Sequence, residues 1–345
     1  MTISLYAEWS KQSAVLLAWP HPDSDWQANL TDAERVYTAL VRQITHFESV
    51  VMIYRDNAHL QHIKSVLKDN NVNTTAIVWT QQRTNDTWAR DFGPITVTDG
   101  TRPVLLDFTF NGWGNKYNAA DDNQVNRQLH QDGIFSDLNM RHYDFILEGG
   151  SIDYDGEGTL LTTKNCLLAP TRNPTLTENE IELELSKMLG VKRTLWLAHG
   201  ELHGDDTDSH IDMLARFCDP ETIAYCSCEN PADEHYIPLQ QMYQELMAFR
   251  RTDGKPYRLV ALPLPQAKYD DDGQRLPASY ANFLIINDAV LLPVYDDPAD
   301  VIAVQQLQAC FPDREIITIN CLPLIRQFGS LHCVTMQLPL GVITQ

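Results

Sequence analysis

Short β-rich runs alternate with amphipathic helical segments along the chain, and this alternation limits the fold more than any other sequence feature. Residues 14–19 and 49–54 are apolar or β-prone throughout, which is typical of buried strands. The segment between them carries an apolar stripe at helical spacing, formed by Ala33, Val36, Leu40, Ile44 and Phe47. The pattern therefore predicts an α/β fold.

Further strands are predicted at residues 104–108, 159–163, 222–226, 283–286 and 289–293. Asn287-Asp288 separates the last two and suits a tight hairpin turn, so part of the sheet structure should be antiparallel. Two capping boxes, Thr31 to Glu34 and Thr177 to Glu180, predict helix starts. Gly190 should end the second helix, whose apolar face is formed by Ile181, Leu185, Met188 and Leu189.

The chain contains 345 residues and has no Ser-, Gly- or Pro-rich linker, so we expect a single domain over residues 1–345. The longest polar interruption, residues 266–275, is either a mobile loop over a pocket or a solvated surface loop. Seven cysteines without paired spacing predict mostly buried structural thiols. Cys226 and Cys228 would share one face of a strand, where a redox or metal role is the less favoured interpretation.

The formal net charge of −20 argues against a nucleic-acid partner and is compatible with a small cationic substrate. The N-terminus lacks a basic region followed by an apolar one, and no run of about 18 apolar residues follows. We therefore expect a cytoplasmic protein with no membrane partner.

Several segments combine chemically useful side chains with loop-like positions. Asp91 precedes the Gly93-Pro94 break and Glu148 precedes two glycines, although ordinary turn chemistry would explain both. Residues 199–212 are rich in histidine and aspartate, which suits either a metal site or a proton-transfer histidine beside a substrate-binding carboxylate. On an extended segment His210 and Asp212 would point the same way, and His332 would point away from Cys333.

Taken together, these segments resemble the agmatine deiminase family, which is grouped with bacterial, Porphyromonas-type peptidylarginine deiminases in the guanidino-group-modifying, or pentein, superfamily. The resemblance extends from about Trp9 to Gln337, and it is carried in order by residues 85–94, 111–117, 147–152, 206–212 and His332-Cys333. It implies the pentein fold, an α/β propeller in which about five ββαβ modules surround a pseudo-fivefold axis.

The resemblance also implies the chemistry. Cys333 would be the nucleophile, Asp91 and Asp212 would bind the guanidinium nitrogens, and His210 would protonate departing ammonia and then activate water. Glu148 would support the site. A covalent thiouronium on Cys333 would be hydrolysed to a ureido product, N-carbamoylputrescine if the substrate is agmatine, with no metal or other cofactor.

The substrate is less constrained than the reaction. Gly329-Ser330-Leu331 and Asp208-Ser209 replace a glycine-rich run and an Asn-Gly pair that many agmatine deiminases carry there. An acidic rim including Asp206, Asp208 or Glu201 would suit the free amine of agmatine, and Trp88 and Trp113 would either flank its aliphatic chain or pack in the core.

Three alternatives remain open from the sequence. The enzyme could be a peptidylarginine deiminase that forms citrulline. A metal-dependent amidohydrolase would use His199, His203, His210 and neighbouring aspartates, and a non-catalytic polyamine binder would not need Cys333. A homo-oligomer is compatible with each of them.

Overall fold

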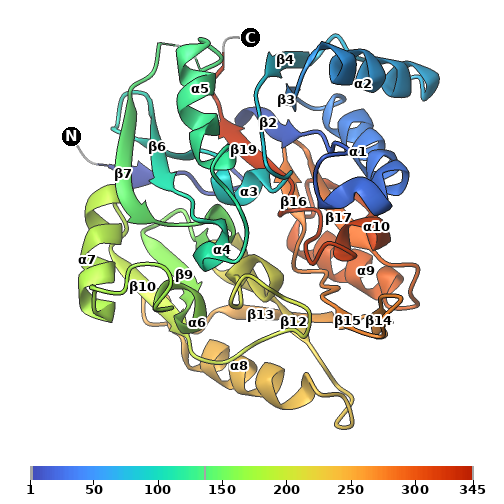
Figure 1. Cartoon of the computed structure of the whole chain (residues 1–345). Helices are drawn as coiled ribbons and strands as arrows, with labels where there is room; N and C mark the ends of the chain where they lie inside the picture. The colour runs from blue at the N-terminus through green and yellow to red at the C-terminus, as the bar shows by residue number, and fades with distance from the viewer. Residues whose placement is uncertain (1–2, 136, 344–345) are drawn as a thin grey trace.

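The computed structural model describes residues 3–135 and 137–343 and has a mixed α/β fold. The strands form several small sheets near the middle of the molecule, and the longer helices lie around the outside (Figure 1). None of the helices within these residues combines the length and apolarity needed to cross a bilayer.

Four sheets share one order, in which an antiparallel hairpin is followed by a parallel strand. The first joins β5 (Ile95–Thr98), β6 (Pro103–Thr109) and β7 (Met140–Ile146), with β1 (Ser4–Leu5) at its edge. The second joins β8 (Ile152–Tyr154), β9 (Thr159–Thr163) and β10 (Arg193–Leu197). The others join β11 (Ala215–Asp219), β12 (Thr222–Ser227) and β13 (Arg258–Pro263), and β16 (Leu284–Ile286), β17 (Ala289–Val294) and β18 (Glu315–Asn320).

A further sheet joins the two ends of the chain. The C-terminal strand β19 (Met336–Pro339) pairs antiparallel with β2 (Gln12–Ala18), which continues in parallel into β3 (Ser49–Tyr54) and β4 (Ile77–Gln81). The red and blue arrows of this pair lie side by side in Figure 1. This pairing fixes the segment just before β19, which contains Cys333, beside the N-terminal part of the molecule.

Parallel strands need a crossover, and helices supply it here. The crossover helices are α1 (Leu30–Ile44), α2 (Asn57–Asp69), α5 (Val125–Gln131), α7 (Glu178–Leu189), α8 (Tyr236–Ala248) and α9 (Asp300–Cys310). Shorter helical turns are η1 (Asp25–Ala28), α3 (Ala89–Phe92), α4 (Gly112–Asn115), η2 (Asp122–Gln124), η3 (Gly149–Ser151), α6 (Lys164–Leu167), η4 (Ile211–Met213) and α10 (Leu322–Ile325).

Every strand predicted from the sequence is present, and the predicted hairpin is confirmed. Asp288 adopts a φ of 59° between β16 and β17, as a tight hairpin requires. The polar segment 266–275 forms a small hairpin of β14 (Lys268–Tyr269) and β15 (Arg275–Leu276).

The two predicted capping boxes had different outcomes. At α7 the Thr177 and Glu180 side chains cap each other's backbone, and Gly190 ends the helix with a φ of 74°. At α1 the prediction was wrong, because the helix begins one residue before Thr31 and Asn29 is its N-cap. Glu34 instead accepts a hydrogen bond from the Trp19 indole at 3.0 Å, so packing beneath the helix determines its role.

Candidate active site

A pocket of about 500 Å³, including its open mouth, contains Cys333. Its walls come from loops that follow different strands, and they carry six carboxylates but no Lys or Arg among the described residues that line it. The lining residues are Asp25, Asp86, Trp88, Asp91, Trp113, Tyr117, Asp205, Asp206, Thr207, His210, Asp212, Met213, Gln327, Phe328, Gly329 and Cys333. Such a surface favours a cationic ligand.

Cys333 lies in a turn just before β19 and is 7% exposed. Its carbonyl accepts a hydrogen bond of 3.1 Å from the Arg90 amide, which ties this turn to α3. The Asn282 amide lies beside the thiol, with Nδ2 at 3.3 Å and Oδ1 at 3.5 Å from Sγ. Burial, together with the negative charges of Asp212 and Asp91, raises the pKa of the Cys333 thiol well above its ordinary value.

Among the described residues that line the pocket, Asp212 is the carboxylate that contacts the thiol. Its Oδ2 is 3.7 Å from Cys333 Sγ and accepts a 2.8 Å hydrogen bond from His332 Nδ1. Oδ1 is buried and has no hydrogen-bond partner within residues 3–135 and 137–343. Burial raises the pKa of this carboxyl, but the hydrogen bond and charge of His332 and the nearby His210 outweigh it, and the net shift is downward.

The segment that carries His210 and Asp212 is not extended, although the two side chains do come together. Asp208 and Ser209 have φ values of 69° and 68°, and the chain then enters the 3-10 turn η4. Left-handed backbone at non-glycine residues is strained, and here it brings both side chains to one point beside Gly150. A Cβ built on Gly150 would lie 2.7 Å from His210 Nδ1, 2.8 Å from Asp91 Oδ1 and 3.0 Å from Asp212 Oδ2.

His210 is almost fully buried, and its Nε2 has no hydrogen-bond partner in the described part of the chain. Burial lowers the pKa of this histidine to about 3, so the imidazole is neutral in the empty pocket and can accept a proton. Glu148 lies behind it, outside the pocket lining, with a carboxylate oxygen within 4.8 Å of a ring nitrogen. Arg172 Nε donates to Glu148 Oε1 at 2.9 Å, and both side chains are fully buried.

Asp91 is held at the end of α3 by two donors. The Trp113 indole donates to Oδ2 at 2.9 Å, and the Gly150 amide donates to Oδ1 at 2.9 Å. Trp113 itself has a φ of 55°, a rare conformation for a bulky side chain, within the sequence Asn-Gly-Trp-Gly-Asn. Burial and the charge of Asp212 raise the pKa of Asp91 well above its ordinary value.

Trp88, Trp113 and Asp206, which the sequence suggested as substrate-binding residues, all line the pocket. Trp88 donates to Asp86 Oδ2 at 3.0 Å, and Asp206 accepts a 2.8 Å hydrogen bond from the Tyr117 hydroxyl. The other two proposed rim acids, Asp208 and Glu201, do not line it. Asp208 pairs with Lys116 and Arg172, and its side chain therefore turns away from the pocket.

The three histidines that the sequence suggested as metal ligands do not lie close to one another. His199 pairs with Glu245 at 2.9 Å, His203 lies beside Glu234 and His235, and His210 is in the pocket. Glu148, Cys166 and His210 do approach one another within 4.8 Å, but Glu148 is already paired with Arg172 and Cys166 has a pKa raised well above its ordinary value by burial. The histidines that the sequence suggested as metal ligands therefore lie in three separate groups.

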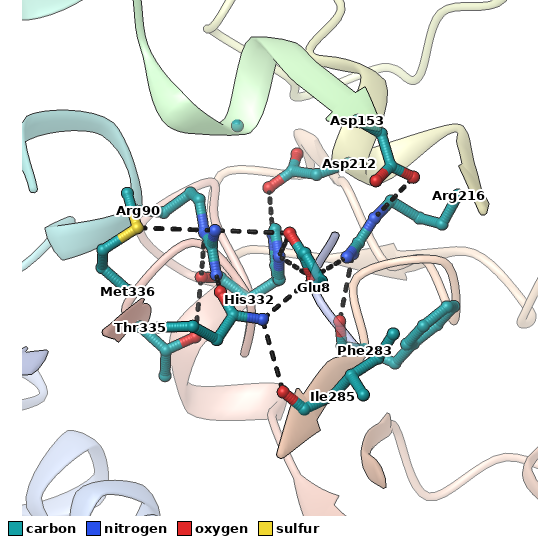
Figure 2. A network of polar contacts seen from close by, with 12 residues as sticks. Glu8, Arg90, Asp153, Asp212, Arg216, Phe283, Ile285, His332, Thr335 and Met336 are labelled. Carbon is teal, nitrogen blue, oxygen red and sulfur yellow. Dashed lines mark hydrogen bonds and ion pairs between the residues drawn. The ribbon is translucent and has the colours of Figure 1, made fainter. Parts of the chain in front are cut away.

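Some residues of the site carry no local sequence signal. Asn282 is separated from Cys333 by 51 positions, and Glu8 lies 324 positions from the His332 ring that it contacts. His332 is in a turn rather than a strand, and its ring faces Glu8 and Asp212 (Figure 2). Only tertiary contacts identify these residues.

Comparisons with known proteins agree with this arrangement. Residues 4–339 match the family described as Porphyromonas-type peptidyl-arginine deiminase. An agmatine deiminase from Ectopseudomonas mendocina is 31% identical over 356 residues, covering 96% of this chain and 94% of the relative.

Two solved structures extend the likeness to the whole fold. One, provisionally named an arginine deiminase, from Porphyromonas gingivalis, is 46% identical with a TM-score of 0.92, covering 99% of this chain and 100% of the other. A cysteine-to-serine variant of a C. jejuni agmatine deiminase with substrate bound is 39% identical with a TM-score of 0.90, covering 97% and 96%. The motif order, the fold and these matches together place the chain in the Porphyromonas-type peptidyl-arginine deiminase family, to which it belongs.

Proposed function

We propose that this protein hydrolyses agmatine to N-carbamoylputrescine and ammonia. The observation that carries the proposal is a buried thiol, Cys333, beside Asp212 in a pocket whose only basic side chain among the described lining residues is His210. A pocket with this charge selects a cation, and the thiol supplies the nucleophile that a guanidinium carbon requires.

Asp91 and Asp212 are the proposed guanidinium ligands. A planar guanidinium offers several N–H donors, which two carboxylates can accept from different sides. Asp212 Oδ1 is suited to this role because it is buried and has no hydrogen-bond partner in the residues that the structure describes. The bound cation would also offset the negative charges of Asp91 and Asp212 that hold the thiol protonated in the empty pocket.

The reaction then proceeds in two halves. Cys333 loses its proton to His210, and the thiolate sulfur bonds to the guanidinium carbon to give a tetrahedral adduct. His210 returns the proton to one amino group, the C–N bond breaks, and ammonia leaves a thiouronium on Cys333. A water that gives one proton to His210 adds to the same carbon. The C–S bond breaks, the sulfur takes the remaining hydroxyl proton of the adduct, and the ureido product and free thiol are released while His210 gives its proton to solvent.

The surroundings of His210 and Glu148 suit them to proton transfer and to the support of the charged ring. The lowered pKa of His210 keeps the ring neutral until a proton is supplied, as a general base must be. Glu148 is placed to stabilise the ring once it is charged, since a carboxylate oxygen lies within 4.8 Å of it.

The substrate tail would extend toward the outer carboxylates. Asp206 is our proposed partner for the amine, with Trp88 and Trp113 along the aliphatic chain. Free arginine or a C-terminal arginine would bring a carboxylate into a wall that already carries Asp25, Asp86, Asp205 and Asp206. Repulsion between these groups favours the amine of agmatine.

We also infer that residues 1–345 form one domain in which the hairpin-plus-parallel-strand units surround a pseudo-fivefold axis. The repeated strand order supports this, as does the construction of the pocket from loops of several units.

The test is ammonia release and ureido product formation from agmatine, arginine and an internal-arginine peptide. Wild type and Cys333→Ala are compared with chelator present. Turnover of agmatine alone that is lost in the variant and unaffected by chelator is the expected result. Turnover of the peptide instead would make the protein a peptidylarginine deiminase, and release by Cys333→Ala would reject the covalent mechanism.

A further inference from the structure

His332 lies behind Asp212, on the side of the reaction centre away from the pocket. Both of its ring nitrogens face carboxylates (Figure 2). Nδ1 is 2.8 Å from Asp212 Oδ2, and Nε2 is 2.9 and 3.2 Å from the two oxygens of Glu8. A carboxylate accepts hydrogen bonds and does not donate them, so both contacts are favourable together when both ring nitrogens carry hydrogen.

Glu8 is surrounded by donors. Oε1 lies 3.3 Å from Arg90 Nη1, while Oε2 accepts hydrogen bonds from Arg216 and, at 2.9 Å, from Gln337. Burial raises the pKa of Glu8, but Arg216, His332 and Arg90 outweigh it and leave the pKa well below its ordinary value. A glutamine at this position would turn its NH₂ group toward one of these donors, so only a carboxylate satisfies them all.

The cluster has balanced charge when His332 is protonated. Arg90, Arg216 and the imidazolium then match the carboxylates of Glu8, Asp212 and Asp153, the last lying 3.3 Å from Arg216. Burial, Arg216 and Arg90 lower the pKa of His332 and outweigh Glu8 and Asp212, which raise it, so the net shift is downward and the protonated ring depends on both carboxylates. Removing the charge of Glu8 should therefore favour the neutral ring and weaken its hydrogen bond to Asp212.

We propose that Glu8 and His332 are positioning residues that hold Asp212 by Oδ2 so that Oδ1 faces the substrate guanidinium. Neither residue lines the pocket, and Glu8 instead lies on the wall of a second cavity that also borders Arg90 and Asp153. The orientation of a substrate-binding carboxylate is thus fixed from a side that the substrate does not enter. This inference rests on the proposed function.

The first experiment compares Glu8→Gln with Asp107→Asn. Asp107 is a suitable control because it is also buried and paired, with Arg127 at 2.8 Å, but lies outside the cluster. We expect Glu8→Gln to lower kcat/KM for agmatine by about 10- to 100-fold, as loss of a supporting group around a site commonly does, while folded Asp107→Asn retains it.

Binding in the Cys333→Ala background separates positioning from general damage. Glu8→Gln should weaken agmatine binding but change the affinity for putrescine, which lacks the guanidinium, by less than about twofold. Equal losses for both ligands, or wild-type kcat/KM in folded Glu8→Gln, would overturn the proposal.

If Glu8→Gln does not fold, two variants of His332 test the positioning role instead. The amide of His332→Asn lies near the place of Nδ1 and can donate to Asp212, whereas that of His332→Gln reaches toward Glu8. We expect the asparagine variant to keep at least about tenfold more kcat/KM, since it keeps the donor to Asp212. Equal activity of the two folded variants would reject the role of that donor. Absence of agmatine turnover by wild type would instead contradict the proposed function.

Discussion

Gly150 leaves the space in which the reactive groups of the pocket meet. Its missing side chain would occupy the point between His210, Asp91 and Asp212. Its amide donates to Asp91, so the same residue opens the space and orients one of the groups that border it. The glycine is thus required by close approach rather than by its backbone conformation.

Gly150→Ala should inactivate the protein more than it destabilises it. A methyl group at 2.7 Å from His210 Nδ1 must displace that ring or the neighbouring carboxylates, and small displacements of reacting groups cost about 100-fold in rate. The measurements are kcat/KM for agmatine and Tm. Gly273→Ala is the control for lost stability without crowding: its φ of 79° disfavours alanine and should lower Tm, but no atom lies within 4 Å of the added carbon, so kcat/KM should be kept. Full activity of Gly150→Ala would contradict the site geometry.

The raised pKa of Cys333 makes a prediction about reactivity in the empty pocket. Burial, Asp212 and Asp91 disfavour the thiolate, so alkylation by neutral iodoacetamide should increase with pH and reach half its maximum above the ordinary thiol range. Asp212→Asn removes one negative charge and should shift this midpoint to lower pH. Cys333→Ala measures the contribution of the other thiols, and a midpoint below the ordinary range in wild type would contradict the prediction.

At the scale of elements, the reaction centre is built from the shortest ones. Asp91 lies in a single turn of helix, α3, while Gly150 and Asp212 lie in the 3-10 turns η3 and η4. Long helices such as α1 and α7 bury apolar stripes against the sheets and provide no residue of the pocket. Stability and chemistry are thus carried largely by different elements, and variants in the long helices should separate the two.

Thr177→Ala and Thr31→Ala test this separation and the two capping predictions. Thr177 caps α7, and its loss should cost about 1 kcal/mol, which lowers Tm by about 1–2 °C in a chain of this length. Thr31 lies within α1 and is exposed, so alanine should leave Tm unchanged or slightly higher. Both variants should keep wild-type kcat. Equal destabilisation by the two would mean that Thr31 also acts as a cap.

At the scale of the whole molecule, the net charge of the chain and the charge of the pocket lining are both negative. The chain carries a net charge of −20, and six carboxylates line the pocket that contains Cys333. A cation would therefore be attracted both by the general field and by the local lining. The field of the surface is screened by salt, whereas buried pairs are screened much less.

The expected consequence is a salt-dependent kcat/KM for agmatine. Because the screening length falls from about 30 Å at 0.01 M to about 3 Å at 1 M, kcat/KM should fall by about tenfold over that range while kcat changes little. Steady-state kinetics at several NaCl concentrations provide the measurement. Alkylation of Cys333 by neutral iodoacetamide, which the field does not attract, should be insensitive to salt. A kcat/KM that does not depend on salt would mean that the field plays no part in substrate capture.

The sequence alone determined the α/β class and about a third of the strands, and it supplied the principal site residues as predictions. Apolar runs predicted β2, β3, β6, β9, β12, β16 and β17, and Asn287-Asp288 predicted a hairpin, whereas partner strands such as β7, β10 and β13 were not predicted. Cys333, His210 and Asp91 could be proposed because their segments occur in a family-like order. These features are local, since they depend on spacing along the chain. The same reasoning failed at Thr31, where the packing of Glu34 against Trp19 overrides a local capping pattern.

Only the tertiary structure decided which of these residues meet and how they are held. The left-handed backbone at Asp208 and Ser209 turns His210 and Asp212 toward Gly150, a conformation that the residue types there do not favour. Glu8, just before β2, reaches the Cys333 segment because the C-terminal strand β19 pairs with β2, and Asn282 reaches it from the loop before β16. Contacts of that kind depend on sheet pairing between the two ends of the chain, and no local pattern in the sequence encodes them.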